Sequence, residues 1–150
     1  MAGYRLRRKE GFSLVEVLVA LTILSVGLLA LAVFQVTAIK GNAIASKWTV
    51  ATQLSQDRLE RFRHTAWDNG ILSSDANGFD TGTMQPRYAN LPSAAGDNTT
   101  VRGTLFYRVW YVNNVSTTLR TITVWTCWRD ELSNWHSVML VTQRANVGGM

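Results

Sequence analysis

The chain has 150 residues, enough for one small domain and an anchoring segment but too few for two full domains. Its formal net charge is +5, and the first ten residues carry +3 of that charge. Because the remainder is nearly balanced, the basic composition does not indicate a nucleic-acid-binding protein. The single cysteine, Cys127, excludes an intramolecular disulfide, so packing must supply the stability and the redox compartment stays undecided.

A basic leader, residues 1–11, precedes a long apolar run. Residues 17–39 contain no charged side chain, and as a helix these 23 residues would span about 35 Å. A hydrocarbon core of about 30 Å could therefore be crossed. Four basic residues before the run, with only Lys40 and Lys47 soon after it, predict a cytoplasmic N-terminus and an exported C-terminal part.

Three interpretations of this segment compete. A secretory signal peptide has a basic start, and residues 30–32 offer a small-x-small cleavage pattern, but the apolar run continues past that point and exceeds the usual length of about 7 to 15 residues. A plain membrane anchor explains the length. It leaves Glu16 unexplained, since a carboxylate at the centre of such a helix costs about 2.5 to 3.5 kcal/mol, although a position near the helix start lowers that cost.

The third interpretation rests on the order of residues around Gly11. Phe12 follows the glycine directly, Glu16 lies four positions beyond the aromatic residue, and the apolar run begins at Val17. This order resembles the class III leader of type IV prepilins. The resemblance implies that a prepilin peptidase cleaves between Gly11 and Phe12 on the cytoplasmic side and methylates the new amino group of Phe12.

Glu16 then has a physical role. After cleavage Phe12 would carry a positive amino group, and in a helix Glu16 would lie about 6 Å away along the axis. These charges can pair, within or between subunits, when a subunit leaves the bilayer for a filament with an apolar core, where an unpaired carboxylate would be costly. The resemblance implies the version between subunits, with Glu16 docking on the Phe12 amine of a neighbour.

The helix is expected to continue beyond the membrane and to cover residues 12–64, because no proline occurs before Pro86. Its exported part, residues 40–64, is amphipathic, and Asp57 and Arg61 form a favourable pair four residues apart on its polar face. Ser55 is the one polar interruption of an apolar stripe formed by Ile44, Trp48, Ala51, Leu59 and Phe62. Gly27 and Gly41 are either hinges or points of close helix packing.

The remaining residues predict a loop and then a sheet. Residues 65–101 are rich in Asn, Asp, Gly, Ser and Thr, and we expect a short strand or turn near Phe79 or Tyr88 inside this long loop. Residues 104–112, 120–128 and 135–142 have strand composition, and their short connections favour an antiparallel meander within residues 104–142. One sheet face, with Ile122, Val124 and Trp128, can cover the helix stripe.

The aromatic residues of the sheet exceed what one face needs, so some should be partly exposed. They are Tyr107, Trp110, Tyr111, Trp125 and Trp135. Either they contact a partner subunit or a sugar, or the long loop and the helix cover the two sides of the sheet.

No pattern in the chain indicates catalysis. His64 and His136 lie too far apart for a recognisable metal motif, and Cys127 on a strand is typical of core filling. Neither a phosphate-binding loop nor a supported nucleophile and base is found. We therefore expect no enzyme activity, no catalytic residues, no cofactor and no metal.

The family resemblance can be narrowed. Residues 11–29 resemble the PilV type of type IV minor pilin, residues 51–63 are similar to the second helical segment of that family, and Tyr107 to Trp110 and Thr121 to Val124 give a looser likeness in the head. Major pilins usually close a C-terminal loop with a disulfide, which Cys127 alone cannot form. The I-type minor pseudopilin of type II secretion shares the leader and remains an alternative, as does a membrane-stalked surface-binding module.

The resemblance implies an α+β, type IV pilin-like fold, in which a long N-terminal helix packs on a small antiparallel sheet. Residues 1–11 would be the leader, residues 12–39 the transmembrane and assembly helix, and residues 40–150 the periplasmic head. The protein would prime pilus assembly in a minor pilin complex near the tip, and so affect adhesion and twitching motility indirectly. Expected partners are the prepilin peptidase, other minor and major pilins, the assembly machinery and the inner membrane, but not nucleic acid.

Overall fold

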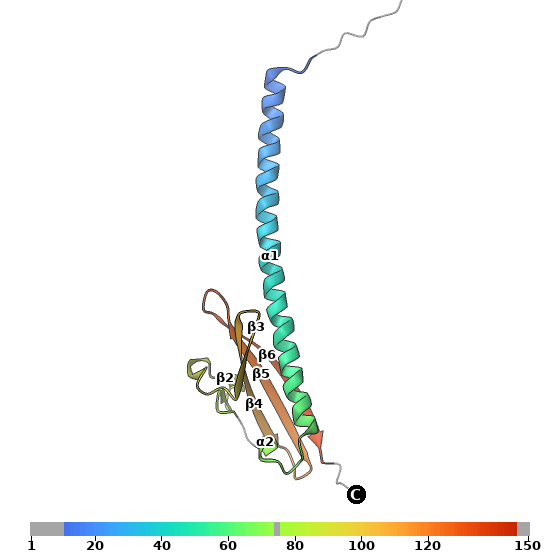
Figure 1. Ribbon diagram of the computed structural model, residues 1–150, viewed down its shortest axis with the longest axis vertical. Coiled ribbons are helices and arrows are strands. Elements are labelled where there is room, and N and C mark those ends of the chain that lie inside the picture. The colour runs from blue at the N-terminus through green and yellow to red at the C-terminus, as the bar shows by residue number, and fades with distance from the viewer. Residues whose placement is uncertain (1–10, 74–75, 147–150) are drawn as a thin grey trace, which may run out of the picture. The chain divides into compact units, whose positions relative to one another are not determined.

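The computed structural model describes residues 11–73 and 76–146 and shows an α+β architecture (Figure 1). A long helix, α1 (Leu14–His64), is followed by short elements and then by an antiparallel sheet. Contacts divide the chain into two compact units, Met1–Ile44 and Ala45–Met150. We call the second the C-terminal unit. The predicted fold class is confirmed.

Helix α1 begins two residues later than the sequence predicts and ends at His64, as expected. The later start has a local cause, because Ser13 caps the helix and so lies just outside it. The helix passes through Gly27 and Gly41 without a break, and a methyl group added at either position would meet no atom within 4 Å. Nothing within a single chain therefore requires glycine at these two positions.

The main sheet has four strands in the order β3-β4-β5-β6, all antiparallel. The three predicted strands are present as β4 (Thr104–Asn114), β5 (Leu119–Arg129) and β6 (Trp135–Ala145), each longer than expected. One edge strand of this sheet, β3 (Asp97–Val101), lies within residues 65–101, which the sequence predicts to be a loop. Its sequence is polar because it is an edge strand that pairs only with β4.

The segment between α1 and β3 contains several short elements. They are α2 (Gly70–Ser73), β1 (Phe79–Asp80), β2 (Gln85–Pro86) and the 3-10 turn η1 (Tyr88–Asn90). Strands β1 and β2 form a separate two-stranded antiparallel sheet. The expectation of local structure near Phe79 and Tyr88 is therefore confirmed.

The even-numbered face of the sheet packs on the part of α1 that belongs to the C-terminal unit. Trp128 lies edge-on to Trp48, with ring centroids 5.1 Å apart, and buries Ala51 in a shared cluster. Ser55 is fully buried, and its hydroxyl is 2.7 Å from that of Thr126 on β5. The polar interruption in the helix stripe is thus matched by a polar residue on the sheet, so neither hydroxyl is left unsatisfied.

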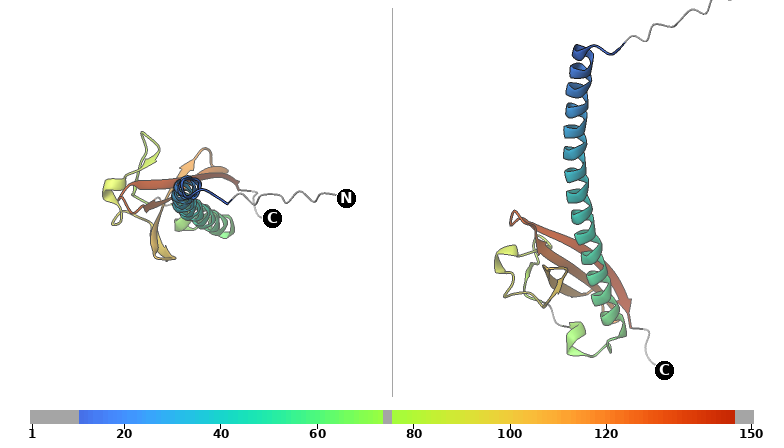
Figure 2. Two further views of the ribbon diagram at one scale, coloured as in Figure 1. Left: turned by 90° about the horizontal axis from the view of Figure 1, so that it is seen from above. Right: turned by 45° about the horizontal axis from the view of Figure 1, so that its top comes forward.

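The odd-numbered face is covered by the segment that connects α1 to β3 (Figure 2). Phe79 stacks on Trp125 at 5.6 Å, and Tyr88 stacks on Trp135 at 5.5 Å. The sheet is therefore covered on both sides. This agrees with the interpretation in which the long loop and the helix cover its two faces. Trp110 and Trp125 are buried, whereas Tyr107, Tyr111 and Trp135 keep part of their surface exposed.

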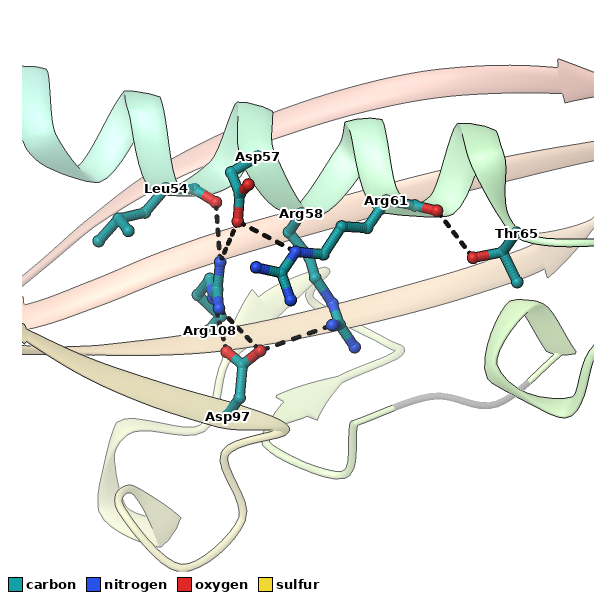
Figure 3. A network of polar contacts seen from close by, with 7 residues as sticks. All are labelled: Leu54, Asp57, Arg58, Arg61, Thr65, Asp97 and Arg108. Carbon is teal, nitrogen blue, oxygen red and sulfur yellow. Dashed lines mark hydrogen bonds and ion pairs between the residues drawn. The ribbon is translucent and has the colours of Figure 1, made fainter.

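A buried arginine on β4 ties α1 to the edge of the sheet (Figure 3). Arg108 is 7% exposed and donates from Nε and Nη2 to both carboxylate oxygens of Asp97, at 2.6 and 2.9 Å. Its Nη1 donates to Asp57 of α1 at 3.1 Å and to the carbonyl of Leu54. Asp57 also pairs with Arg61 at 3.3 Å, as predicted. Asp57 lies on the exposed face of α1, as the sequence predicts, and Arg108 of the sheet also reaches its carboxylate.

A second arginine lies beside this network. Arg58 is 3.6 Å from Asp97, and its guanidinium lies over the ring of Trp110, 4.0 Å from the centroid. Burial, more than any charge nearby, lowers the pKa of Arg58. At the end of α1, Arg144 donates to the carbonyls of Phe62 and Thr65, which the helix leaves without partners. Arginines from the sheet therefore hold α1 at two places.

We predict that Arg108→Ala lowers the free energy of unfolding by about 3 kcal/mol, since it leaves the partly buried carboxylate of Asp97 without its main donor. Denaturant unfolding of the full chain in detergent measures this change. Arg87→Ala is the matched control, because Arg87 is exposed, and it should change stability by less than about 0.5 kcal/mol. Equal stability of the two variants would contradict the assigned role of Arg108.

Candidate functional site at the start of helix α1

The residues expected to be processed lie immediately before α1. Gly11, Phe12 and Ser13 have no regular secondary structure, and the side chain of Phe12 is 84% exposed. A protease must bind a peptide bond in an extended conformation, which a helical bond cannot offer because its backbone is hydrogen-bonded within the helix. The bond between Gly11 and Phe12 is open to such binding.

Ser13 determines where α1 begins. Its hydroxyl accepts a hydrogen bond from the backbone N–H of Val15 at 3.2 Å, and its carbonyl accepts one from Val17 at 3.2 Å. Glu16 occupies the third helical position, so Ser13 and Glu16 have the spacing of a capping box. The sequence analysis missed this signal. Glu16 thus has a local reason to be present, in addition to any pairing between subunits, because its charge suits the positive end of the helix dipole.

Glu16 is exposed and is the only charged residue between positions 11 and 39. It borders a shallow apolar groove lined by Phe12, Val17, Ala20, Leu21 and Leu24. The structure thus brings Phe12 and Glu16 to the same helix start. A carboxylate in such surroundings is a strong acceptor for an amino group that arrives without its hydration shell.

Residues 11–44 expose all of their apolar side chains. Within residues 11–73 and 76–146, α1 is the one helix long and apolar enough to cross a membrane, and the residues of its apolar window are not buried. Large exposed apolar surfaces of this kind require lipid or protein neighbours.

Comparison with known protein families identifies this segment. A model described as the prokaryotic N-terminal methylation motif matches residues 6–32. The N-terminal segment is therefore similar to the start of type IV pilin-like precursors. The motif implies processing by a prepilin peptidase and assembly with pilus components, and with the apolar helix it indicates membrane anchoring. Pilin-type proteins with this motif are structural rather than catalytic.

The match covers the start of the chain and does not extend to the C-terminal unit. No curated protein and no solved structure matches the chain significantly. The motif therefore does not distinguish a minor pilin from a minor pseudopilin.

The other residues singled out in the sequence have structural partners. His64 is 3.0 Å from Glu60, and His136 is 3.0 Å from Asp130. No group of three metal-ligating side chains occurs in the part of the chain that the structure describes. Cys127 is fully buried, and burial raises the pKa of its thiol to about 12, so core filling is its role.

We predict that Ser13→Ala frays the start of α1 by about 1 kcal/mol, because the N–H of Val15 loses its acceptor. Amide hydrogen exchange of Val15, measured on the full chain in nanodiscs, should become about fivefold faster. Ser13→Thr should keep slow exchange. Ser25→Ala is the control inside the helix, since Ser25 bonds only to carbonyls of the preceding turn. Unchanged exchange at Val15 in Ser13→Ala would show that Ser13 is no cap.

Proposed function

We propose that the protein is a type IV minor pilin, of the PilV type, that is cleaved between Gly11 and Phe12, methylated on Phe12, and then primes pilus assembly with other minor pilins near the tip. One observation carries this proposal. The methylation motif coincides with an exposed, non-helical Gly11–Phe12 bond directly before a capped helix start that contains Glu16. The single cysteine, which cannot close a C-terminal disulfide loop, supports a minor rather than a major subunit.

The mechanism follows from the two environments of α1. Before assembly, the apolar side chains of residues 17–39 lie in the inner membrane, with the N-terminus cytoplasmic and the C-terminal unit periplasmic. During assembly, burial among the helices of neighbouring subunits replaces burial in lipid, so the transfer costs little hydrophobic free energy. Glu16 then pairs with the Phe12 amine of a neighbour and selects the axial position of the subunit.

For processing, Gly11→Ala should block removal of the leader, because the Cβ would occupy space beside the scissile bond in the peptidase. N-terminal sequencing or intact mass measures the cleaved fraction in cells that contain the peptidase. Gly27→Ala is the control, since it places the same methyl group on the same segment away from the cleavage site. Normal cleavage of Gly11→Ala would contradict the assignment of this bond.

For docking, Glu16→Ala should be cleaved normally yet fail to assemble. Loss of the carboxylate leaves an amine unpaired in an apolar core, which costs about 3 to 5 kcal/mol and would lower incorporation more than a hundredfold. Quantitative immunoblotting of sheared pili measures incorporation. Glu60→Ala, which removes an exposed glutamate at the far end of α1, is the control. Normal incorporation of Glu16→Ala would refute the docking role.

The leader is shared with the I-type minor pseudopilin of type II secretion, so that function is a second candidate. Complementation separates the two, because a minor pilin restores pili and a pseudopilin restores secretion. The third alternative, a surface-binding module on a membrane stalk, would act without incorporation into any filament.

A further inference from the structure

The C-terminal unit contains a cavity of about 520 Å³ at the end where α1 enters it. Its walls are formed by the β3–β4 turn, the β5–β6 turn, Lys47 of α1, and Leu91 and Pro92 from the segment before β3. Three cationic side chains line it: Lys47, Arg102 and Arg129. The volume falls within the range of about 300 to 1,000 Å³ that is typical of ligand sites.

These three cations differ from most others of the C-terminal unit. Within residues 45–73 and 76–146, the remaining basic side chains other than Arg87 are held by carboxylates or by backbone carbonyls; they are Arg58, Arg61, Arg63, Arg108, Arg120 and Arg144. Lys47, Arg102 and Arg129 pair with no carboxylate in the part of the chain that the structure describes. Three of the four cations left without an anionic or carbonyl partner therefore line one cavity.

The local structure positions these cations without neutralising them. Arg102 and Gly103 form a two-residue hairpin turn in which both φ angles are positive, and the Arg102 guanidinium donates to the Ser46 hydroxyl at 3.2 Å. Arg129 lies over the ring of Trp135, 4.6 Å from the centroid. Lys47 is half-buried on α1.

Two carboxylates also line the cavity, Asp130 and Glu131. Asp130 is occupied by its own turn, since it accepts hydrogen bonds from the N–H groups of Leu132 and Asn134 and faces His136. The contact with His136, more than the bonds within the turn, lowers the pKa of Asp130 to about 2. The cavity thus keeps one net positive charge, and an anionic group fits its three open donors.

The surroundings indicate which anion. Leu132, at the tip of the β5–β6 turn beside the cavity, is 81% exposed, and Leu105 on its wall is also exposed. Apolar side chains next to unpaired cations are typical of a surface that contacts lipid headgroups. Trp135 is already engaged by Tyr88 and Arg129, so its ring is not free to stack on a sugar.

The chain itself keeps this cavity close to the bilayer. Lys47 follows Ile39, the last residue of the uncharged run, by eight positions. Eight residues rise about 12 Å as a helix and reach at most about 28 Å when fully extended. With the apolar run in a membrane, Lys47 cannot move far from the headgroup layer on the same side.

We propose that Lys47, Arg102 and Arg129 bind the phosphate of anionic phospholipid headgroups in the membrane that anchors the precursor. This contact holds the C-terminal unit on the bilayer until the subunit is extracted. The inference rests on the membrane-anchored stage of the proposed function.

The test uses the full chain in nanodiscs of phosphatidylcholine, with and without phosphatidylglycerol, and follows amide exchange in residues 102–103 and 130–134. Exchange should be about fivefold slower in the anionic nanodiscs. This is the fold-change expected from the attraction of one net positive charge to an anionic membrane surface. Lys47→Gln, Arg102→Gln and Arg129→Gln together should abolish the difference, whereas Arg87→Gln should preserve it. The charge-conserving set Lys47→Arg, Arg102→Lys and Arg129→Lys should also preserve it, which separates loss of charge from loss of folding.

Two results would overturn the proposal alone. One is equal exchange in both lipids while residues 17–39 stay protected, which shows an inserted chain whose cavity ignores headgroups. The other is an equal slowing on adding inorganic phosphate, or an acidic peptide, to phosphatidylcholine nanodiscs, which identifies a soluble anion or a protein as the ligand. Unprotected residues 17–39 in both lipids would overturn the membrane-anchored stage and this inference together.

Discussion

The packing of the second half of α1 on one face of the sheet is the contact on which the C-terminal unit depends. A small meander cannot bury both faces by itself, and α1 covers the even-numbered face through Ala51, Ser55 and Phe62. Arg108 then fixes where the helix lies, because its planar guanidinium must satisfy Asp97 and Asp57 at once. Apolar contact supplies most of the stability, and this polar network determines the position of α1 on the sheet.

The first half of α1, unlike the second, has no sheet of its own chain to cover its apolar side chains. Its apolar side chains are exposed in the isolated chain, so it is stable in lipid or among other helices but not in water. This is the physical basis for the proposed function, in which the subunit is stored in a membrane and later assembled. The capping and charged groups of this half lie at one end, where Ser13 starts the helix and Glu16 provides its only charge before Lys40.

Much of this was accessible from the sequence, and each error has a specific cause. The long helix, its end at His64 and three of the strands follow from periodicity and composition. Strand β3 was missed because an edge strand with one polar face has the composition of a loop. The cap at Ser13 is readable from its spacing to Glu16, but the same residues also form part of the processing motif, so one short stretch carries two signals.

The sequence by itself determined the apolar run, the motif around Gly11, Phe12 and Glu16, and the α+β class, because these depend on local order and on periodicity. Only the tertiary structure decided that Asp57 faces Arg108, that Ser55 meets Thr126, and that Lys47, Arg102 and Arg129 share one cavity. Each of these arrangements brings a residue of α1 together with sheet residues about 50 to 80 positions further along the chain, and no local pattern encodes this. The cavity arises because the β3–β4 turn, the β5–β6 turn and Lys47 of α1 reach the same end of the unit.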